Sequence, residues 1–199
     1  MNSEKNSQQY CKITDQGYKF RSFFALDLPK NIQEEITSII NTLKKQNKYC
    51  NLHWSKPENL HLTIRFLGNI SFSQYEKIIS RVGESIKGFK SFVISLDDLI
   101  IFPSPEYPVI LALKPEPFLV LLMLNQLIEK GLASCEVQEE LRAFRPHLTL
   151  GRIRNKIHLE IPTVKLPQLK FTVNNLQLYR SELSKNGSKY TLLKSFDFN

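Results

Sequence analysis

Hydrophobic and polar positions follow two rhythms along the chain, one typical of β-strands and one typical of α-helices. Residues 20–26 are rich in apolar and aromatic side chains and stop before a proline, which predicts a strand. In residues 31–46 the apolar side chains recur every three or four positions, which predicts an amphipathic helix. A second helix is predicted over residues 73–86, with Ser73 as its N-cap and Glu76 completing a capping box.

Strand-like segments dominate the rest of the chain. Further strands are predicted at residues 60–67, 89–99, 109–113, 147–153, 171–179 and 190–196. An apolar helix is predicted over residues 118–130, where Gly131 ends it. The last two strands are expected to form a hairpin around Asn186 and Gly187. No segment has the composition of a linker between domains.

Two of these strands carry, at or near their start, the motif His-Leu-Thr followed by an aliphatic residue. The copies are His61-Leu62-Thr63-Ile64 and His147-Leu148-Thr149-Leu150. Because side chains alternate between the two faces of a strand, the His and the Thr of each copy should share one face, while the aliphatic residues point into a core. The chain has only four histidines, so two in matched strand contexts are the strongest functional signal in the sequence.

The residue types of this motif suit chemistry on a phosphodiester. Two imidazoles titrate near neutrality, so that one can act as general base and the other as general acid. Two threonine hydroxyls can donate hydrogen bonds to phosphate oxygens. The residues alone do not decide which histidine is the acid, because the two copies are nearly symmetric.

The position of one motif in each half of the chain predicts the architecture. We expect an α+β fold of two pseudo-symmetric lobes, each an antiparallel sheet with outer helices, around a central cleft that holds both motifs. Residues 1–18 are polar and are expected to form a flexible N-terminal tail. Residues 19–199 are expected to form a single bilobal domain.

Composition narrows the classes of partner and compartment. The 27 Lys and Arg residues exceed the 19 Asp and Glu residues, which gives a net charge of +8 and favours a polyanion such as nucleic acid. Cys11, Cys50 and Cys135 show no CxxC spacing, which indicates a reducing compartment and neither a disulfide framework nor a zinc site. No apolar run has membrane-spanning length and no signal peptide is evident, so a cytoplasmic protein without membrane contact is expected.

A metal centre is the main alternative to acid–base chemistry. Two histidines without Asp, Glu or Cys at ligand spacing make a poor zinc or iron site, although Asp97 and Asp98 on another strand leave this alternative open. His53 and His158 have no Thr partner and are interpreted as structural or surface residues.

Both motifs, read in full, resemble those of a known family. The segment from His61 to Gly68 is similar to the H-x-T-x-x-F-L-G motif of the RNA 2',3'-cyclic phosphodiesterases, formerly called 2'-5' RNA ligases, of the two-histidine (2H) phosphoesterase superfamily. The segment from Pro146 to Arg152 resembles their second motif, P-H-x-T-x-x-R. Residues 21–26 and the C-terminal hairpin also resemble the family, so the similarity covers about residues 19–198.

The resemblance implies a monomeric esterase that needs no metal or other cofactor and opens the 2',3'-cyclic phosphate end of RNA to a 2'-phosphate. Fragments of tRNA and small cyclic nucleotides are candidate substrates. By resemblance, His147 is the proton acceptor, His61 the proton donor, and Thr63 and Thr149 hold the non-bridging oxygens. Two alternatives stay open: 2'-5' RNA ligation by the same site, and a non-catalytic nucleotide- or RNA-binding module, against which the intact H-x-T pairs argue.

Three further residues are candidates for substrate binding. Arg152 matches the arginine of the second motif, but strict alternation places it on the face opposite His147, so a bend near Gly151 would be needed. Alternation places Arg65 on the face of His61, where it could contact the phosphate. Phe23 could stack on a base.

Overall fold

A computed structural model describes residues 18–46, 52–153, 166–184 and 187–199, so most of the predicted tail, Cys11, Cys50, His158 and Asn186 lie outside the described residues. The helices are α2 (Lys30–Gln46), α3 (Phe72–Ser85) and α4 (Phe118–Leu132), with a 3-10 turn η1 (Pro57–Asn59). The strands are β1 (Lys19–Asp27), β2 (Leu52–Trp54), β3 (His61–Ser71), β4 (Phe92–Ser104), β5 (Tyr107–Glu116), β6 (Leu148–Ile153), β7 (Leu169–Val173), β8 (Asn175–Ser184) and β9 (Gly187–Asp197).

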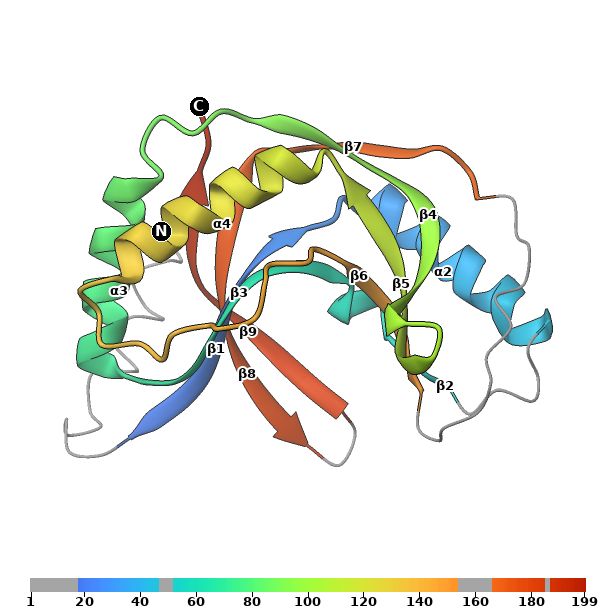
Figure 1. The fold of residues 1–199 in the computed structure, drawn as a ribbon, viewed down its shortest axis with the longest axis horizontal. Coiled ribbons are helices and arrows are strands. Elements are labelled where there is room, and N and C mark those ends of the chain that lie inside the picture. Colours follow the sequence, from blue (N-terminus) through green and yellow to red (C-terminus); the bar gives the residue numbers. More distant parts are fainter. Residues whose placement is uncertain (1–17, 47–51, 154–165, 185–186) are drawn as a thin grey trace, which may run out of the picture.

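The described strands form one curled antiparallel sheet (Figure 1). Its order is β7-β4-β5-β6-β3-β1-β8-β9, and β2 pairs with β6 beside β3. The sheet is narrowest in its middle, where β3 and β6 pair at Leu62 and Leu148. The predicted α+β class is therefore confirmed, whereas the division into two pseudo-symmetric lobes stays a prediction.

Helices α2 and α4 cross from one part of the sheet to the other, whereas α3 stays with β3, the strand that it follows (Figure 1). In Figure 1, α3 and α4 lie together over the part that contains β3, while α2 lies beside β4 and β5. Helix α4 follows β5 in the chain but binds β3, because Asn125 Nδ2 donates to the carbonyl of Ile64 at 3.0 Å. Helices α3 and α4 approach closely at Gly131, where a Cβ atom would lie 2.8 Å from Val82 Cα. The aliphatic core fills the space between these helices and the sheet.

Several element boundaries differ from the predictions. Strand β3 does not end at Gly68 but continues to Ser71, because Gly68 adopts a φ of +70° and still pairs with β1. The capping box of α3 therefore lies two residues earlier than predicted, with Ser71 as N-cap and Gln74 as its partner. None of the helices in the described ranges is long and apolar enough to cross a membrane.

The strands near the prolines and near the C-terminus also differ. Strand β4 extends through Pro103, which sequence patterns assign to a loop, because β5 is the one strand that pairs with this end of β4 in the described residues. The single strand predicted over residues 171–179 is two strands, β7 and β8, separated at Asn174. The carbonyl of Asn174 accepts from the Phe198 backbone N–H at 2.7 Å. This carbonyl therefore binds the C-terminal segment and does not continue the pairing of either strand.

Candidate active site

The narrow junction of the sheet brings the two motifs together. Leu62 of β3 and Leu148 of β6 are register partners, and both are buried in the core. In an antiparallel pair, the residues that flank these leucines point to the opposite face of the sheet. The face away from the core therefore carries both motif pairs: His61, Thr63, His147 and Thr149.

A backbone carbonyl oxygen holds each imidazole in the same way. His61 Nδ1 lies 2.8 Å from the carbonyl oxygen of Asn59, and His147 Nδ1 lies 2.8 Å from that of Arg145. A carbonyl oxygen only accepts, so each Nδ1 carries a proton and donates it. Each neutral ring thus keeps the lone pair on Nε2, which at His61 faces the Thr63 hydroxyl at 2.9 Å. Each Nε2 can accept a proton when the ring is neutral and return it when the ring is charged.

The surroundings of both rings disfavour the imidazolium form. Burial is the largest cause that lowers the pKa of His61, and the charges of His147 and Arg152 act in the same direction. The hydrogen bond to Asn59 opposes them, and the pKa that results is about 4. Burial also lowers the pKa of His147, assisted by the positive charges of Arg152 and Arg145. Both rings are consequently neutral at pH 7 in the free protein, in a field that attracts an anion.

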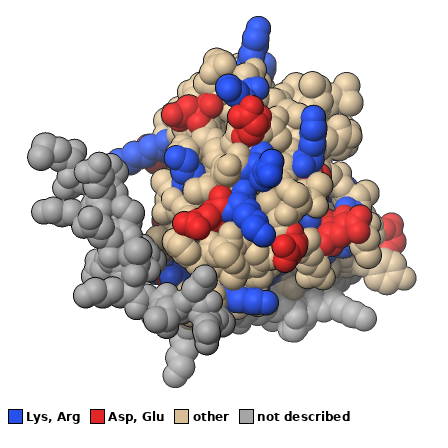
Figure 2. All heavy atoms as spheres, turned by 90° about the vertical axis from the view of Figure 1, so that its left-hand side faces the viewer, with Lys and Arg blue, Asp and Glu red and all other residues tan. Residues whose placement is uncertain are grey.

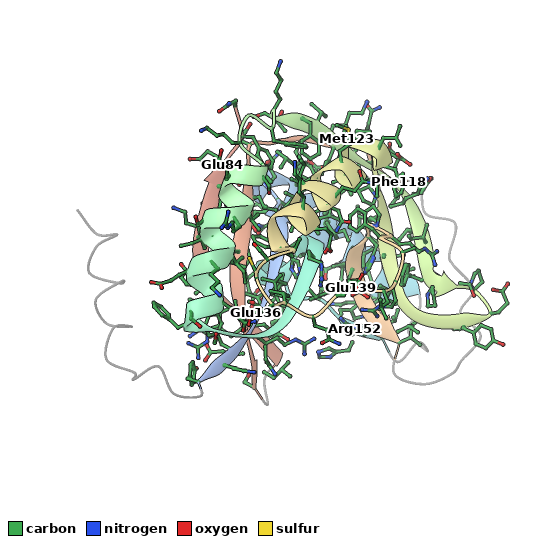
Figure 3. The ribbon with its side chains drawn as sticks, turned by 60° about the vertical axis from the view of Figure 1, so that its left-hand side comes forward. Glu84, Phe118, Met123, Glu136, Glu139 and Arg152 are labelled. Atoms are coloured by element: carbon green, nitrogen blue, oxygen red, sulfur yellow. The ribbon has the colours of Figure 1, made fainter. Side chains whose placement is uncertain are left out.

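A β-bulge brings Arg152 to this face of the sheet. Ala112 of β5 pairs with Thr149 of β6, and the next β5 residue, Leu111, pairs with Gly151. Strand β6 therefore carries one extra residue, Leu150, between these two pairs. The extra residue reverses the alternation and turns Arg152 to the face of Thr149, which supplies the bend required by the sequence argument. In Figure 3, Arg152 lies on the far side of the sheet from Phe118 and Met123 of α4.

A second bulge has the opposite effect on Arg65, and the sequence-based placement of this residue is wrong. Between Thr63 and Arg65, β3 also carries one extra residue relative to β1, so Arg65 turns toward the helices. It is 5% exposed and forms an ion pair with Glu129 of α4. Its guanidinium also donates to the carbonyl oxygens of Phe66 and, at 2.8 Å, of Gln138. These contacts leave it no access to a phosphate.

Phe23 is not available to stack on a base, contrary to the sequence prediction, because its ring is 2% exposed. It packs against the ring of His61 at 5.0 Å and stacks on Tyr179 at 5.6 Å between centroids. Tyr190 meets Phe23 edge-on at 5.0 Å and His61 edge-on at 5.2 Å. Phe23 and Tyr190 therefore wall the His61 ring and contribute to its burial.

Sequence reasoning missed the residues that surround His147 as well. The ring of Phe102, from β4, stacks on His147 at 4.6 Å, and the Arg145 guanidinium lies 4.5 Å from the centroid of Phe102 on β4. No local signal in the sequence indicates these contacts, because they depend on β4 and β5 lying next to β6 in the sheet.

The described residues contain no group of three or more His, Cys, Asp and Glu side chains that could hold a metal ion. Asp97 and Asp98, which the sequence left open as ligands, lie on β4. His53 lies exposed on β2 and is the register partner of Arg152.

Comparisons with known proteins place the chain in a family. A family model described as LigT-like phosphoesterase matches residues 26–111. The RNA 2',3'-cyclic phosphodiesterase of Archaeoglobus fulgidus is 30% identical over 184 residues, which cover 89% of this chain and 99% of the relative. That of Methanothermobacter thermautotrophicus is 29% identical over 186 residues, covering 89% and 98%. The crystal structure of Escherichia coli LigT complexed with 3'-AMP is 26% identical, with a TM-score of 0.75, and covers 91% of this chain and 99% of LigT. The chain therefore belongs to the LigT-like phosphoesterase family.

Proposed function

We propose that this protein hydrolyses the 2',3'-cyclic phosphodiester at the end of an RNA to a 2'-phosphomonoester, without a metal or other cofactor. One observation carries the proposal: two His/Thr pairs share one face of the sheet, and each His has its Nδ1 bound to the carbonyl two residues before it. The names of the curated relatives support the same activity.

In the proposed reaction the cyclic phosphate lies between the two imidazoles. His147 Nε2 takes a proton from water, whose oxygen bonds to phosphorus as the bond from phosphorus to the ribose 3'-oxygen breaks. His61 Nε2 gives its proton to that 3'-oxygen, and exchange with solvent restores both rings. Thr63, Thr149 and Arg152 stabilise the charge that grows on the non-bridging oxygens. The assignment of base to His147 and acid to His61 follows the family resemblance.

The low pKa values of both histidines fit this cycle. The acid must be charged when it acts, although burial and Arg152 disfavour imidazolium in the free protein. A bound phosphodiester anion supplies the opposite charge and raises the pKa of the ring beside it. Protonation of the acid is therefore coupled to substrate binding.

An oligonucleotide that ends in a 2',3'-cyclic phosphate tests the proposal. We expect hydrolysis that persists in EDTA and yields only the 2'-phosphate. Complete inhibition by EDTA that added metal reverses would contradict the metal-free mechanism. Joining of a cyclic end to a 5'-hydroxyl RNA would reveal ligation, which shares the site by microscopic reversibility, and tight binding without turnover would indicate a binding module.

A sulfur substitution tests the assignment of the two histidines. When sulfur replaces the bridging 3'-oxygen, the leaving group is a thiolate. The pKa of a thiol is much lower than that of an alcohol, so the thiolate leaves with little need of a proton from the general acid. His61→Ala should then recover most of its lost rate on the sulfur substrate, while His147→Ala should not. Recovery by His147→Ala alone would reverse the assignment.

A further inference from the structure

An open groove begins beside the histidines, and Arg152 is the one residue of its described lining that has a role in the reaction described above. Strand β2 and turn η1 form one wall, and the start of β9 forms the other. The groove has about 480 Å³ of empty space, which includes open solvent. Its polar lining includes His53, Lys56, Asn59, Arg152, Ser188 and Tyr190.

The groove is continuous with the proposed site. Asn59 takes part in both: its carbonyl accepts from His61 Nδ1 at 2.8 Å, and its side-chain amide donates to the carbonyl of Ser188 at 2.9 Å. Tyr190 lines the groove and also meets the His61 ring edge-on. One end of the groove is therefore the wall that encloses His61.

The charges of the groove have a single sign. His53, Lys56 and Arg152 are basic, and none of the described lining residues is acidic. His53 and Arg152 are antiparallel register partners, so their side chains lie next to each other on one face. Among the described residues no carboxylate forms an ion pair with Lys56 or Arg152, and both His53 and Lys56 are exposed.

The backbone fixes this cluster where Arg152 turns outward. The Ser55 N–H donates to the carbonyl of Leu150, the extra residue of the bulge, at 2.8 Å. The Ser55 hydroxyl donates to the carbonyl of Thr149, also at 2.8 Å. The bulge that turns Arg152 toward the site thus also anchors the segment that carries His53 and Lys56.

We propose that this groove binds the RNA strand that leads into the cyclic end, with His53 and Lys56 holding the phosphate on the 5' side of the terminal nucleotide. The inference rests on the proposed function and specifies its substrate: a strand with at least one internucleotide phosphate. Unpaired cations and hydroxyl donors in an open groove suit the backbone of single-stranded RNA. A mononucleotide 2',3'-cyclic phosphate lacks the phosphate that the groove recognises.

Two substrates isolate this contact: a mononucleotide 2',3'-cyclic phosphate and a dinucleotide that ends in the same cyclic nucleotide. For Lys56→Ala and for His53→Ala, KM for the dinucleotide should rise about tenfold relative to KM for the mononucleotide. The salt dependence of dinucleotide binding should fall in log–log slope by about 0.7 for the lost phosphate contact.

Lys90→Ala is the matched control, because it removes the same charge from the exposed segment between α3 and β4 and should change neither KM. Equal rises for both substrates, or the same loss from Lys90→Ala, would overturn the groove assignment. Binding of the 2'-phosphorylated dinucleotide and mononucleotide, measured by calorimetry, gives the same ratio without turnover. Inactivity of the wild-type protein would then count against the proposed function, while the ratio of Kd values still decides the groove.

Discussion

The two motif histidines are held alike but surrounded differently. Each Nδ1 is fixed by one backbone carbonyl, yet His61 lies within the aromatic wall of Phe23 and Tyr190, whereas His147 lies under Phe102 and near the exposed Arg145. The heavier burial of His61 explains why its pKa falls to about 4. The aromatic and charged residues around each ring therefore set its protonation.

This difference predicts an acidic pH optimum. The profile of kcat/KM reports the free enzyme, in which one ring must be neutral and the other charged. That state is most populated between the two pKa values, so kcat/KM should peak between pH 4 and the ordinary histidine value of 6.5. Bound phosphate favours imidazolium, so the profile of kcat should lie at higher pH. A kcat/KM optimum above pH 7 would contradict this electrostatic account.

At the scale of elements, two bulges decide which arginine faces the site. Alternation correctly placed the His and Thr of each motif, because these residues precede the bulges. It failed for Arg65 and required an extra bend for Arg152, because each lies beyond an added residue. A bulge depends on the register with a neighbouring strand, so one strand's sequence does not reveal it. The aromatic residues around the histidines could not be predicted from the motif strands either, since they come from strands distant in the sequence.

Because the bulges turn the two arginines to opposite faces, we expect Arg65→Ala to affect stability and Arg152→Ala to affect activity. Arg65→Ala removes an ion pair with a partly exposed Glu129 and leaves the Gln138 and Phe66 carbonyls without their donor, so it should lower the free energy of unfolding by about 1–3 kcal/mol. Arg152→Ala should change stability by less than about 0.5 kcal/mol but lower kcat/KM at least about tenfold. Urea unfolding and steady-state kinetics on both variants measure the contrast. The reverse pattern would mean that the faces are misassigned.

At the scale of the whole molecule, the surplus of positive charge does not form one patch on the face that carries α3. Figure 2 shows acidic and basic side chains interspersed over the face that carries α3. The groove beside the histidines, by contrast, has basic residues and no acidic one in its described lining. The net charge of +8 suggested a polyanion from the sequence, but only the fold shows a groove whose described lining has basic residues and no carboxylate.

The crossed helices predict a single cooperative unfolding transition. Helix α4 follows β5 but is bound to β3, and β3 pairs with β6 at the middle of the sheet. Neither part of the sheet can therefore lose its structure without exposing the core of the other. Melting followed by far-UV and near-UV circular dichroism should give coincident midpoints. Two separate transitions would show that the parts fold independently.

The kcat of His61→Ala, His147→Ala and the double variant on a 2',3'-cyclic-phosphate oligonucleotide tests the central claim most directly. If the two imidazoles act as one acid–base pair, each single change should lower kcat by about 10²–10⁴-fold while the protein stays folded. The double change should lower kcat by far less than the product of the two single effects. A single variant that retains more than about a tenth of the wild-type kcat would remove that histidine from the mechanism.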